Sequence, residues 1–298
     1  MKKERIRDDI EQHKIFDAKE NYDDSKPTVD TTLAPEQDKK KEPILEIKGL
    51  GIDFGGLTAV DEFTMSLWPT EIAGIIGPNG AGKTTIFNLL TKVYQPTRGT
   101  FYFDGQNTSG MNTARIARLG IARTFQNIRL FDKLTVEENV KTAMNRQLDY
   151  GLFSSLFHGR KYRNQEREAH EKALQLLSLF DMQDLADVKA SSLPYGAQRR
   201  VEIVRAIATQ PKVLLLDEPA AGMNPSETAE LMNNIRKIRD QLGIAILLIE
   251  HDMSLVMNVC EGLAVLNFGR IIAKGKPEEI QKNPAVIEAY LGKQKENA

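Results

Sequence analysis

A short glycine-rich segment constrains this chain more than any other feature. Gly77-Pro-Asn-Gly-Ala-Gly-Lys83-Thr84 fits the pattern G-x-x-x-x-G-K-[ST], after an apolar strand expected at residues 72–76 and before a helix expected at residues 83–93. Glycines let successive backbone N–H groups turn inward, and a helix N-terminus carries partial positive charge. The pattern therefore predicts a phosphate-binding loop in which Lys83 reaches the β and γ phosphates and Thr84 binds Mg²⁺. An ordinary glycine-rich turn is disfavoured, because the motif and both flanking elements agree.

Two adjacent carboxylates form the second candidate group. The apolar run from Val213 to Leu216 is typical of a strand buried on both faces of a parallel sheet, and it delivers Asp217 and Glu218 to the strand's carboxyl end. Asp217 is then a candidate Mg²⁺ ligand, and Glu218 is a candidate base that activates a water for attack on the γ-phosphate. A solvated Asp-Glu pair is the alternative, which the phosphate-binding loop disfavours. The guanine-reading motif N/T-K-x-D is missing, which argues against a GTPase.

The order of the remaining patterns predicts an α/β fold. Short strand-like segments begin at Ile44, a mostly helical block is expected over residues 135–180, and a strand, helix and strand follow from Val213. Asn224 and Pro225 predict the start of that helix, with the apolar positions 231, 235, 238 and 242 on one face and Gly243 at its end. Strand, helix and strand then form a right-handed parallel crossover.

Composition excludes several classes of protein. The 298 residues are 41% hydrophobic and 27% charged, which argues against a collagen-like or wholly disordered chain. The formal net charge of −1 predicts no general attraction to nucleic acid. Cys260 is the only cysteine, which excludes an intramolecular disulfide. The sequence contains no uninterrupted run of 18 apolar residues, so it predicts no membrane-spanning helix. The charged residues 1–43 predict a polar, disordered tail.

The chain resembles the ATP-binding cassette (ABC) family in the order of its motifs. After the glycine-rich loop come Gln126 in RTFQ, then LPYGAQRR, LLLDEP and finally His251 in LLIEHD. The resemblance implies a P-loop NTPase fold with a RecA-like parallel sheet core, a small antiparallel β subdomain and an inserted helical subdomain over about residues 127–190. It covers residues 44–292 as a single cassette, and residues 293–298 would form a C-terminal tail.

Further site residues come from this resemblance. Gln126 would contact the metal or the attacking water and report bound nucleotide to a membrane partner, and His251 would hydrogen-bond the γ-phosphate. Considered singly, a glutamine is usually a surface residue and a histidine after a strand is usually structural. Phe54 lies where the family stacks an aromatic ring on adenine, with a core aromatic as the alternative. The resemblance implies ATP and Mg²⁺ as ligands. The expected catalytic residues are Glu218, His251, Gln126 and Lys83; the expected nucleotide-binding residues are Phe54, Gly77, Pro78, Asn79, Gly80, Ala81, Gly82, Lys83, Thr84, Thr85, Gln126 and Asp217; and the expected metal ligands are Thr84, Gln126 and Asp217.

The signature segment departs from the family pattern L-S-G-G-Q. Here Leu193, Pro194, Tyr195, Gly196 and Ala197 precede Gln198, so the serine is replaced by proline. In the family, the signature of one cassette binds the γ-phosphate of ATP held by a second cassette. Pro194 has no hydroxyl, although backbone N–H groups at the start of the following helix remain able to contact phosphate. We therefore expect this chain to complete one composite site less well than its partner does.

Within the family, the chain resembles the larger ATP-binding subunit of branched-chain amino acid importers. The stretches that carry this resemblance are FGGLTAVDEF, RTFQNIRLF, LPYGAQRRVEI, DEPAAGMNP, LLIEHDMSLVM and NPAVIEAYLG. It implies a second, different ATPase subunit, two membrane permease subunits and, indirectly, an extracytoplasmic solute-binding protein, with the chain at the cytoplasmic face of the membrane. Urea, amide or lipopolysaccharide transport stays open as an alternative. A soluble ABC ATPase acting on ribosomes or DNA also stays open, although Asp217 follows Lys83 by 134 positions and the segment between them lacks the sustained heptads of chromosome ATPases.

Overall fold

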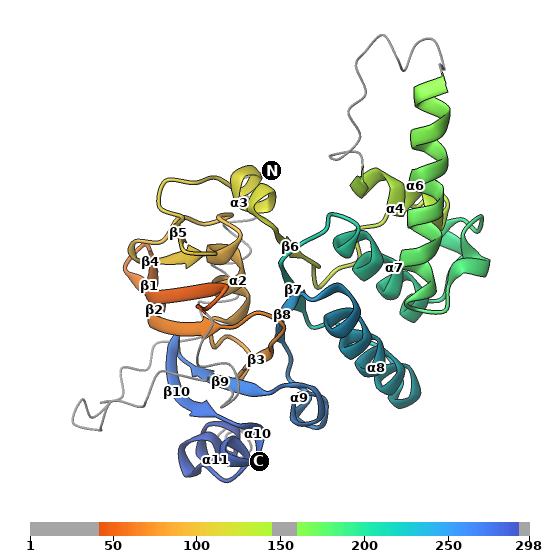
Figure 1. The fold of residues 1–298 in the computed structure, drawn as a ribbon. Helices are drawn as coiled ribbons and strands as arrows, with labels where there is room; N and C mark the ends of the chain where they lie inside the picture. Colours follow the sequence, from red (N-terminus) through yellow and green to blue (C-terminus); the bar gives the residue numbers. More distant parts are fainter. Residues whose placement is uncertain (1–41, 145–159, 292–298) are drawn as a thin grey trace.

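A computed structural model describes residues 42–144 and 160–291 of the chain (Figure 1). A six-stranded sheet forms the centre, in the order β10-β9-β3-β8-β7-β6. Its strands are β3 (Ile72–Ile76), β6 (Ile121–Arg123), β7 (Val213–Asp217), β8 (Ala245–Ile249), β9 (Gly262–Asn267) and β10 (Arg270–Gly275). All neighbours pair in parallel except β10, which is antiparallel to β9. The parallel core that the apolar runs predicted is therefore confirmed.

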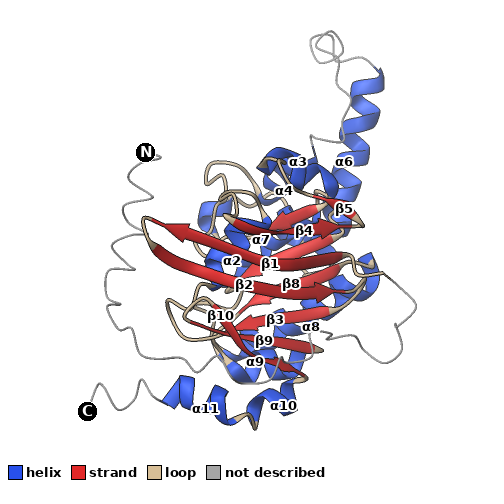
Figure 2. Ribbon diagram, turned by 90° about the vertical axis from the view of Figure 1, so that its left-hand side faces the viewer, coloured by secondary structure: helices blue, strands red, loops and turns tan. Residues whose placement is uncertain are grey.

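A second, antiparallel sheet lies against this core (Figure 2). Its order is β2-β1-β4-β5, with β1 (Leu45–Phe54), β2 (Leu57–Leu67), β4 (Arg98–Phe103) and β5 (Gln106–Asn107). Phe54 pairs with Leu57, so the two residues between them, Gly55 and Gly56, make a tight hairpin turn at positive φ. This turn places Phe54 at the end of β1.

Helices cover the sheets and form a separate group beside them (Figure 1). Around the sheets lie α2 (Lys83–Leu90), α3 (Thr113–Leu119), α8 (Pro225–Leu242), α9 (Met253–Val259), α10 (Pro277–Gln281) and α11 (Pro284–Leu291). The separate group, which we call the helical lobe, contains α4 (Val136–Met144), α6 (Arg160–Ser178) and α7 (Tyr195–Ile207), with 3-10 turns at Gln183–Leu185 and Ala190–Ser192. No helix within the described ranges has the length and apolar character needed to cross a bilayer.

Three of the parallel strands, β3, β7 and β8, are buried along their whole length. Leu214 and Leu216 of β7 pack into a core that they share with α8 and the helical lobe. Val213 and Leu215 point to the opposite face and pack into a core shared with α2 and the antiparallel sheet. Alternate side chains of a strand point to opposite faces, so a strand between two cores must be apolar throughout. Polar residues are therefore confined to the ends of these strands, and those that follow the carboxyl ends come together on one side of the sheet.

The two helix starts expected from local signals, at Lys83 and Asn224, are confirmed, whereas one of the two expected helix ends is wrong. Asn224 and Glu227 form the capping box that begins α8, and Gly243 ends the helix at positive φ. Leu242 is 39% exposed, so the expected fourth member of the apolar face of α8 lies at its solvent edge. The helix expected over residues 83–93 already ends at Leu90. Most of the expected tail 1–43, part of the block 135–180 and the tail 293–298 lie outside the described residues.

Candidate functional site

The glycine-rich loop connects β3 to α2, as the motif predicts. Gly77 adopts φ 152°, and a Cβ atom there would lie 2.1 Å from the carbonyl oxygen of Leu266, so only glycine fits. Gly82 is the N-cap of α2 and provides no side-chain cap for its first N–H groups. Lys83 is 6% exposed, and its Nζ donates to the carbonyl oxygens of Gly77 at 2.7 Å and Pro78 at 3.0 Å. The ammonium group therefore lies inside the loop, at the N-terminus of a helix.

Asp217 ends β7 beside a cation that the sequence did not reveal. Arg123, the last residue of β6, donates from Nη2 to Asp217 Oδ2 at 2.7 Å, with side-chain exposures of 5% and 2%. Its Nη1 donates to Asn88 Oδ1 of α2 at 2.7 Å. Burial lowers the pKa of Arg123, and the neighbouring Asp217 carboxylate opposes that shift. Arg123 thus links the Asp217 carboxylate to α2 and fixes the position of one relative to the other.

Glu218, Gln126 and His251 come together at the same edge of the sheet. Gln126 Nε2 donates to Glu218 Oε2 at 3.1 Å, and His251 Nδ1 lies 4.0 Å from the same oxygen. Glu218 adopts φ 46°, a strained conformation for a residue with a side chain, and its N–H donates to the carbonyl of Ile249. Gln126 and His251 are exposed, so both can meet a ligand. The three residues expected around the reacting phosphate therefore share one location.

Glu250 is a second residue that sequence reasoning missed. It follows β8 directly, is 1% exposed, and accepts from the N–H of Ala220 at 3.0 Å and of His251 at 3.2 Å. Burial raises its pKa, and these two N–H groups oppose the rise. Glu250 therefore fixes the turn after Glu218 and the backbone of His251. An acidic residue straight after a buried strand is the signal that identified Asp217, and it applied here as well.

Phe54 lies at the end of β1 with its ring partly buried. The ring of Tyr94 meets it edge-on, with centroids 5.2 Å apart and an interplanar angle of 75°. Part of the ring also packs against the core under α2. The Phe54 ring is therefore partly packed against the core and partly open to solvent, and its stacking on adenine stays a prediction.

The signature residues lie elsewhere, at the start of α7 in the helical lobe (Figure 1). Pro194 is the N-cap of α7 and makes no side-chain cap, as expected without a hydroxyl. Leu193, Gly196 and Ala197 are buried, whereas Tyr195 is exposed. A Cβ atom on Gly222 would lie 3.1 Å from the Tyr195 ring, so this ring packs on the segment before α8. The single chain therefore keeps its signature apart from its own phosphate-binding loop.

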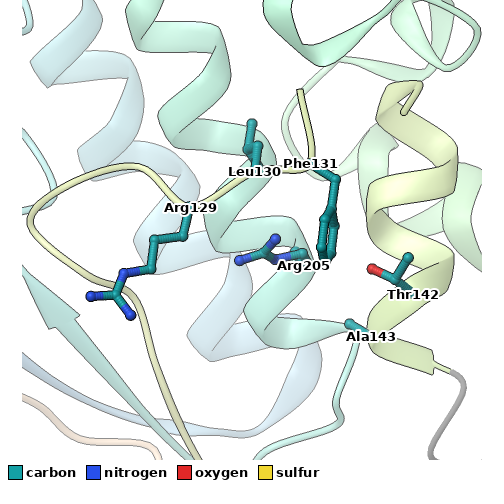
Figure 3. A pocket seen from close by; sticks show the side chains of 6 residues that line it. All are labelled: Arg129, Leu130, Phe131, Thr142, Ala143 and Arg205. Atoms are coloured by element: carbon teal, nitrogen blue, oxygen red, sulfur yellow. The ribbon is translucent and has the colours of Figure 1, made fainter. Parts of the chain in front are cut away.

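An open pocket of about 500 Å³ lies between the loop after β6 and the helical lobe (Figure 3). We define the Gln126 loop as residues 124–135, between β6 and α4. The pocket is lined by Arg129, Leu130, Phe131, Thr142, Ala143 and Arg205. Phe131 is 54% exposed, and the guanidinium of Arg205 lies 5.6 Å from its ring centroid. The pocket combines exposed apolar surface with two cations.

The donor set fits a magnesium nucleotide. A buried ammonium, glycines at positive φ and the start of α2 suit a chain of phosphates. The exposed hydroxyl-bearing Thr84, the carboxylate of Asp217 and the amide of Gln126 supply the oxygen ligands that Mg²⁺ prefers. The fold and this site together define a P-loop nucleotide-binding protein.

Comparisons with known proteins specify the family. A family profile described as ABC transporter matches residues 60–221, and one described as branched-chain amino acid ATP-binding cassette transporter matches residues 270–296. The chain is 48% identical to the high-affinity branched-chain amino acid transport ATP-binding protein LivG of Escherichia coli (strain K12), over 84% of this chain and 98% of that protein. It is 47% identical to the corresponding BraF of Pseudomonas aeruginosa, with the same coverage.

A solved structure agrees with these relatives. The ADP conformation of MJ1267, an ATP-binding cassette of an ABC transporter, superposes with a TM-score of 0.74 at 32% identity, covering 85% of this chain and 100% of that one. The chain belongs to the ABC transporter family. The recognition of the family from motif order and the expected cassette fold are both confirmed.

Proposed function

We propose that this chain is the ATP-binding and ATP-hydrolysing subunit of a membrane importer for branched-chain amino acids. The observation that carries the proposal is the hydrogen bond of 3.1 Å between Gln126 and Glu218 at the sheet edge that also carries the Lys83 loop. The 48% identity to LivG supports the choice of solute class.

The residues divide the chemistry among themselves. Lys83 and the N–H groups at the start of α2 bind the phosphates of ATP, and Phe54 stacks on the base. Thr84, Gln126 and Asp217 would hold Mg²⁺, and the ion would supply positive charge beside the transferred phosphoryl group. Glu218 takes the proton of the attacking water, Gln126 orients that water through its amide, and His251 donates to the γ-phosphate. Pro78, Asn79, Gly80, Ala81 and Thr85 complete the binding loop.

The site requires a second cassette to close it. The signature residues 193–198 lie in the helical lobe, away from the Lys83 loop, so they serve ATP bound by another subunit. The N–H groups at the start of α7 supply the contact, whereas Pro194 supplies no hydroxyl. We propose a different chain as the partner, with this chain's signature making the weaker of two composite sites.

The pocket beside the Gln126 loop is the proposed contact with the membrane permease. Phe131 offers exposed apolar surface, and Arg129 and Arg205 offer charge next to it. A loop that touches both the permease and Glu218 can transmit movement between transport and hydrolysis. Two permease subunits, an extracytoplasmic solute-binding protein that does not touch this chain, and a position at the cytoplasmic face complete the proposed assembly; nucleic acid has no part in it.

Reconstitution tests the proposal. The chain, its partner cassette, the permeases and the solute-binding protein in lipid vesicles should take up leucine only with ATP. Glu218→Gln should lower the ATPase rate by roughly 10²- to 10⁴-fold with nucleotide affinity retained. Glu168→Gln, an exposed position on α6, is the matched control.

The outcomes separate the alternatives. Uptake of urea or an amide instead of leucine would show that the importer carries a different class of solute. Ribosomes or DNA recovered with the chain, in place of membrane proteins, would favour a soluble ATPase. An unchanged rate in Glu218→Gln would contradict the assigned base.

A further inference from the structure

Arg199 of α7 is a wholly buried cation whose hydrogen bonds reach a different element. Its side chain is 0% exposed. Nη1 donates to the carbonyl oxygen of Phe125 at 2.5 Å, and Nη2 donates to that of Gln126 at 2.6 Å. Two consecutive carbonyls of the Gln126 loop are therefore bound by one planar guanidinium, a geometry that lysine cannot reproduce.

Glu202 completes the arrangement from the next turn of the same helix. It lies three residues further along α7, is 2% exposed, and accepts from Arg199 Nη1 at 2.9 Å. Burial raises the pKa of Glu202, whereas Arg199 and the backbone N–H groups of Phe125 and Arg129 lower it. The helix thus presents a cation to two carbonyls of the loop and holds that cation with an anion of its own.

The loop carries the residue on which hydrolysis depends. Residues 124–135 contain no helix or regular strand. Backbone hydrogen bonds tie the two ends of the loop, from Thr124 N to the carbonyl of Leu215 and from Ala190 N to the carbonyl of Leu134, and side chains such as Arg199 hold the part between them. Gln126, held by its carbonyl to Arg199, donates from its side chain to Glu218 at 3.1 Å. A displacement of about 1 Å in such a group is enough to cost roughly 10²-fold in rate.

The same arginine also reaches the signature segment. Arg199 Nη2 donates to the hydroxyl of Tyr195 at 3.4 Å, and the Tyr195 ring lies 5.9 Å from its guanidinium. Tyr195 packs on Gly222, in the turn that follows Glu218. Contacts therefore run from the Gln126 loop, which lines the pocket at Arg129, Leu130 and Phe131, to the start of α7.

Stability alone does not account for a buried ion pair in this position. Replacing such a pair by apolar residues of similar volume is often neutral or stabilising. We propose that Arg199 and Glu202 are positioning residues that clamp the Gln126 loop to α7, so that the loop and the signature move as one unit. This inference rests on the proposed function.

The test replaces the clamp without leaving a buried charge. Arg199→Met combined with Glu202→Leu should fold, and nucleotide affinity of the full chain should stay within about threefold, since the Lys83 loop is untouched. In the free chain, amide hydrogen exchange at residues 125–129 should rise by about tenfold or more relative to β7. In the assembled transporter, kcat should fall by roughly 10²-fold while KM changes little.

Controls separate positioning from general damage. Arg239→Met with Glu261→Leu removes an Arg–Glu pair that joins α8 to the segment before β9, and it should leave both readouts unchanged. Arg199→Lys keeps the charge but loses the paired carbonyl contacts, and its kcat should lie between the parent and the double variant. Unchanged exchange at residues 125–129, an unchanged kcat, or a rise in KM that accounts for the whole loss would overturn the inference. A parent complex without ATPase activity would instead refute the proposed function, while the exchange result on the free chain would still decide whether the clamp exists.

Discussion

Replacing Arg123 by methionine tests how the Asp217 carboxylate is held. The two side chains are buried and 2.7 Å apart, and the guanidinium also bonds Asn88 and lies 5.4 Å from the ring centroid of Phe87. Removing one partner of a buried pair leaves an uncompensated charge, which costs about 3–5 kcal/mol. For a chain of this size that corresponds to a fall in Tm of roughly 6–20 °C. Circular dichroism of the nucleotide-free chain measures it.

Two further variants make this measurement decisive. Arg123→Met combined with Asp217→Leu should recover most of the loss, because no buried charge remains. Arg98→Met removes an exposed arginine that pairs with Asp53 and Asp61, and it should change the Tm far less. The reasoning is refuted when Arg123→Met costs no more than Arg98→Met, or when the double variant melts no higher than the single one.

Three other variants test separate parts of the description. Lys83→Ala should weaken nucleotide binding by roughly 10- to 150-fold, because a charged hydrogen-bond donor is lost; calorimetry that finds equal affinity contradicts its role. Pro194→Ser should raise the ATPase rate of the assembled complex, and an unchanged rate argues against the weaker composite site. Burial raises the pKa of Glu71 from 4.5 to about 8, so the folded chain keeps a proton that the unfolded chain loses, and stability falls as pH rises between these values. Glu71→Gln should show a smaller fall in Tm between pH 5 and 8 than the parent chain. Equal falls in the two proteins would contradict the raised pKa of Glu71.

The sequence predicted the features that depend on neighbouring residues. The strand, loop and helix around Lys83 and the capping box at Asn224 are local patterns, and the structure confirms them. The sheet core followed as well, because a strand between two apolar layers has no polar positions. Motif order singled out Gln126 and His251, and the structure brings both close to Glu218, whereas their roles toward a nucleotide stay predictions.

The missed residues depend on contacts between distant segments. Arg123 and Asp217 are 94 positions apart, and they meet because β6 pairs with β7 in a register that sets Arg123 beside Leu215. Arg199 and the Gln126 loop are likewise separated by 73 positions. No local pattern encodes such a register. An arginine on a strand or helix therefore looks like any surface cation until the elements are assembled.

The two adjacent carboxylates after β7 acquire different environments through these distant contacts. Asp217 is 2% exposed and bound to a cation, so it is fixed and its charge is already balanced within the protein. Glu218 is 17% exposed and accepts from a neutral amide, so it retains access to water. The different surroundings of the two acids thus follow from Arg123 and Gln126, which the edge strand β6 and the loop after it bring to Asp217 and Glu218.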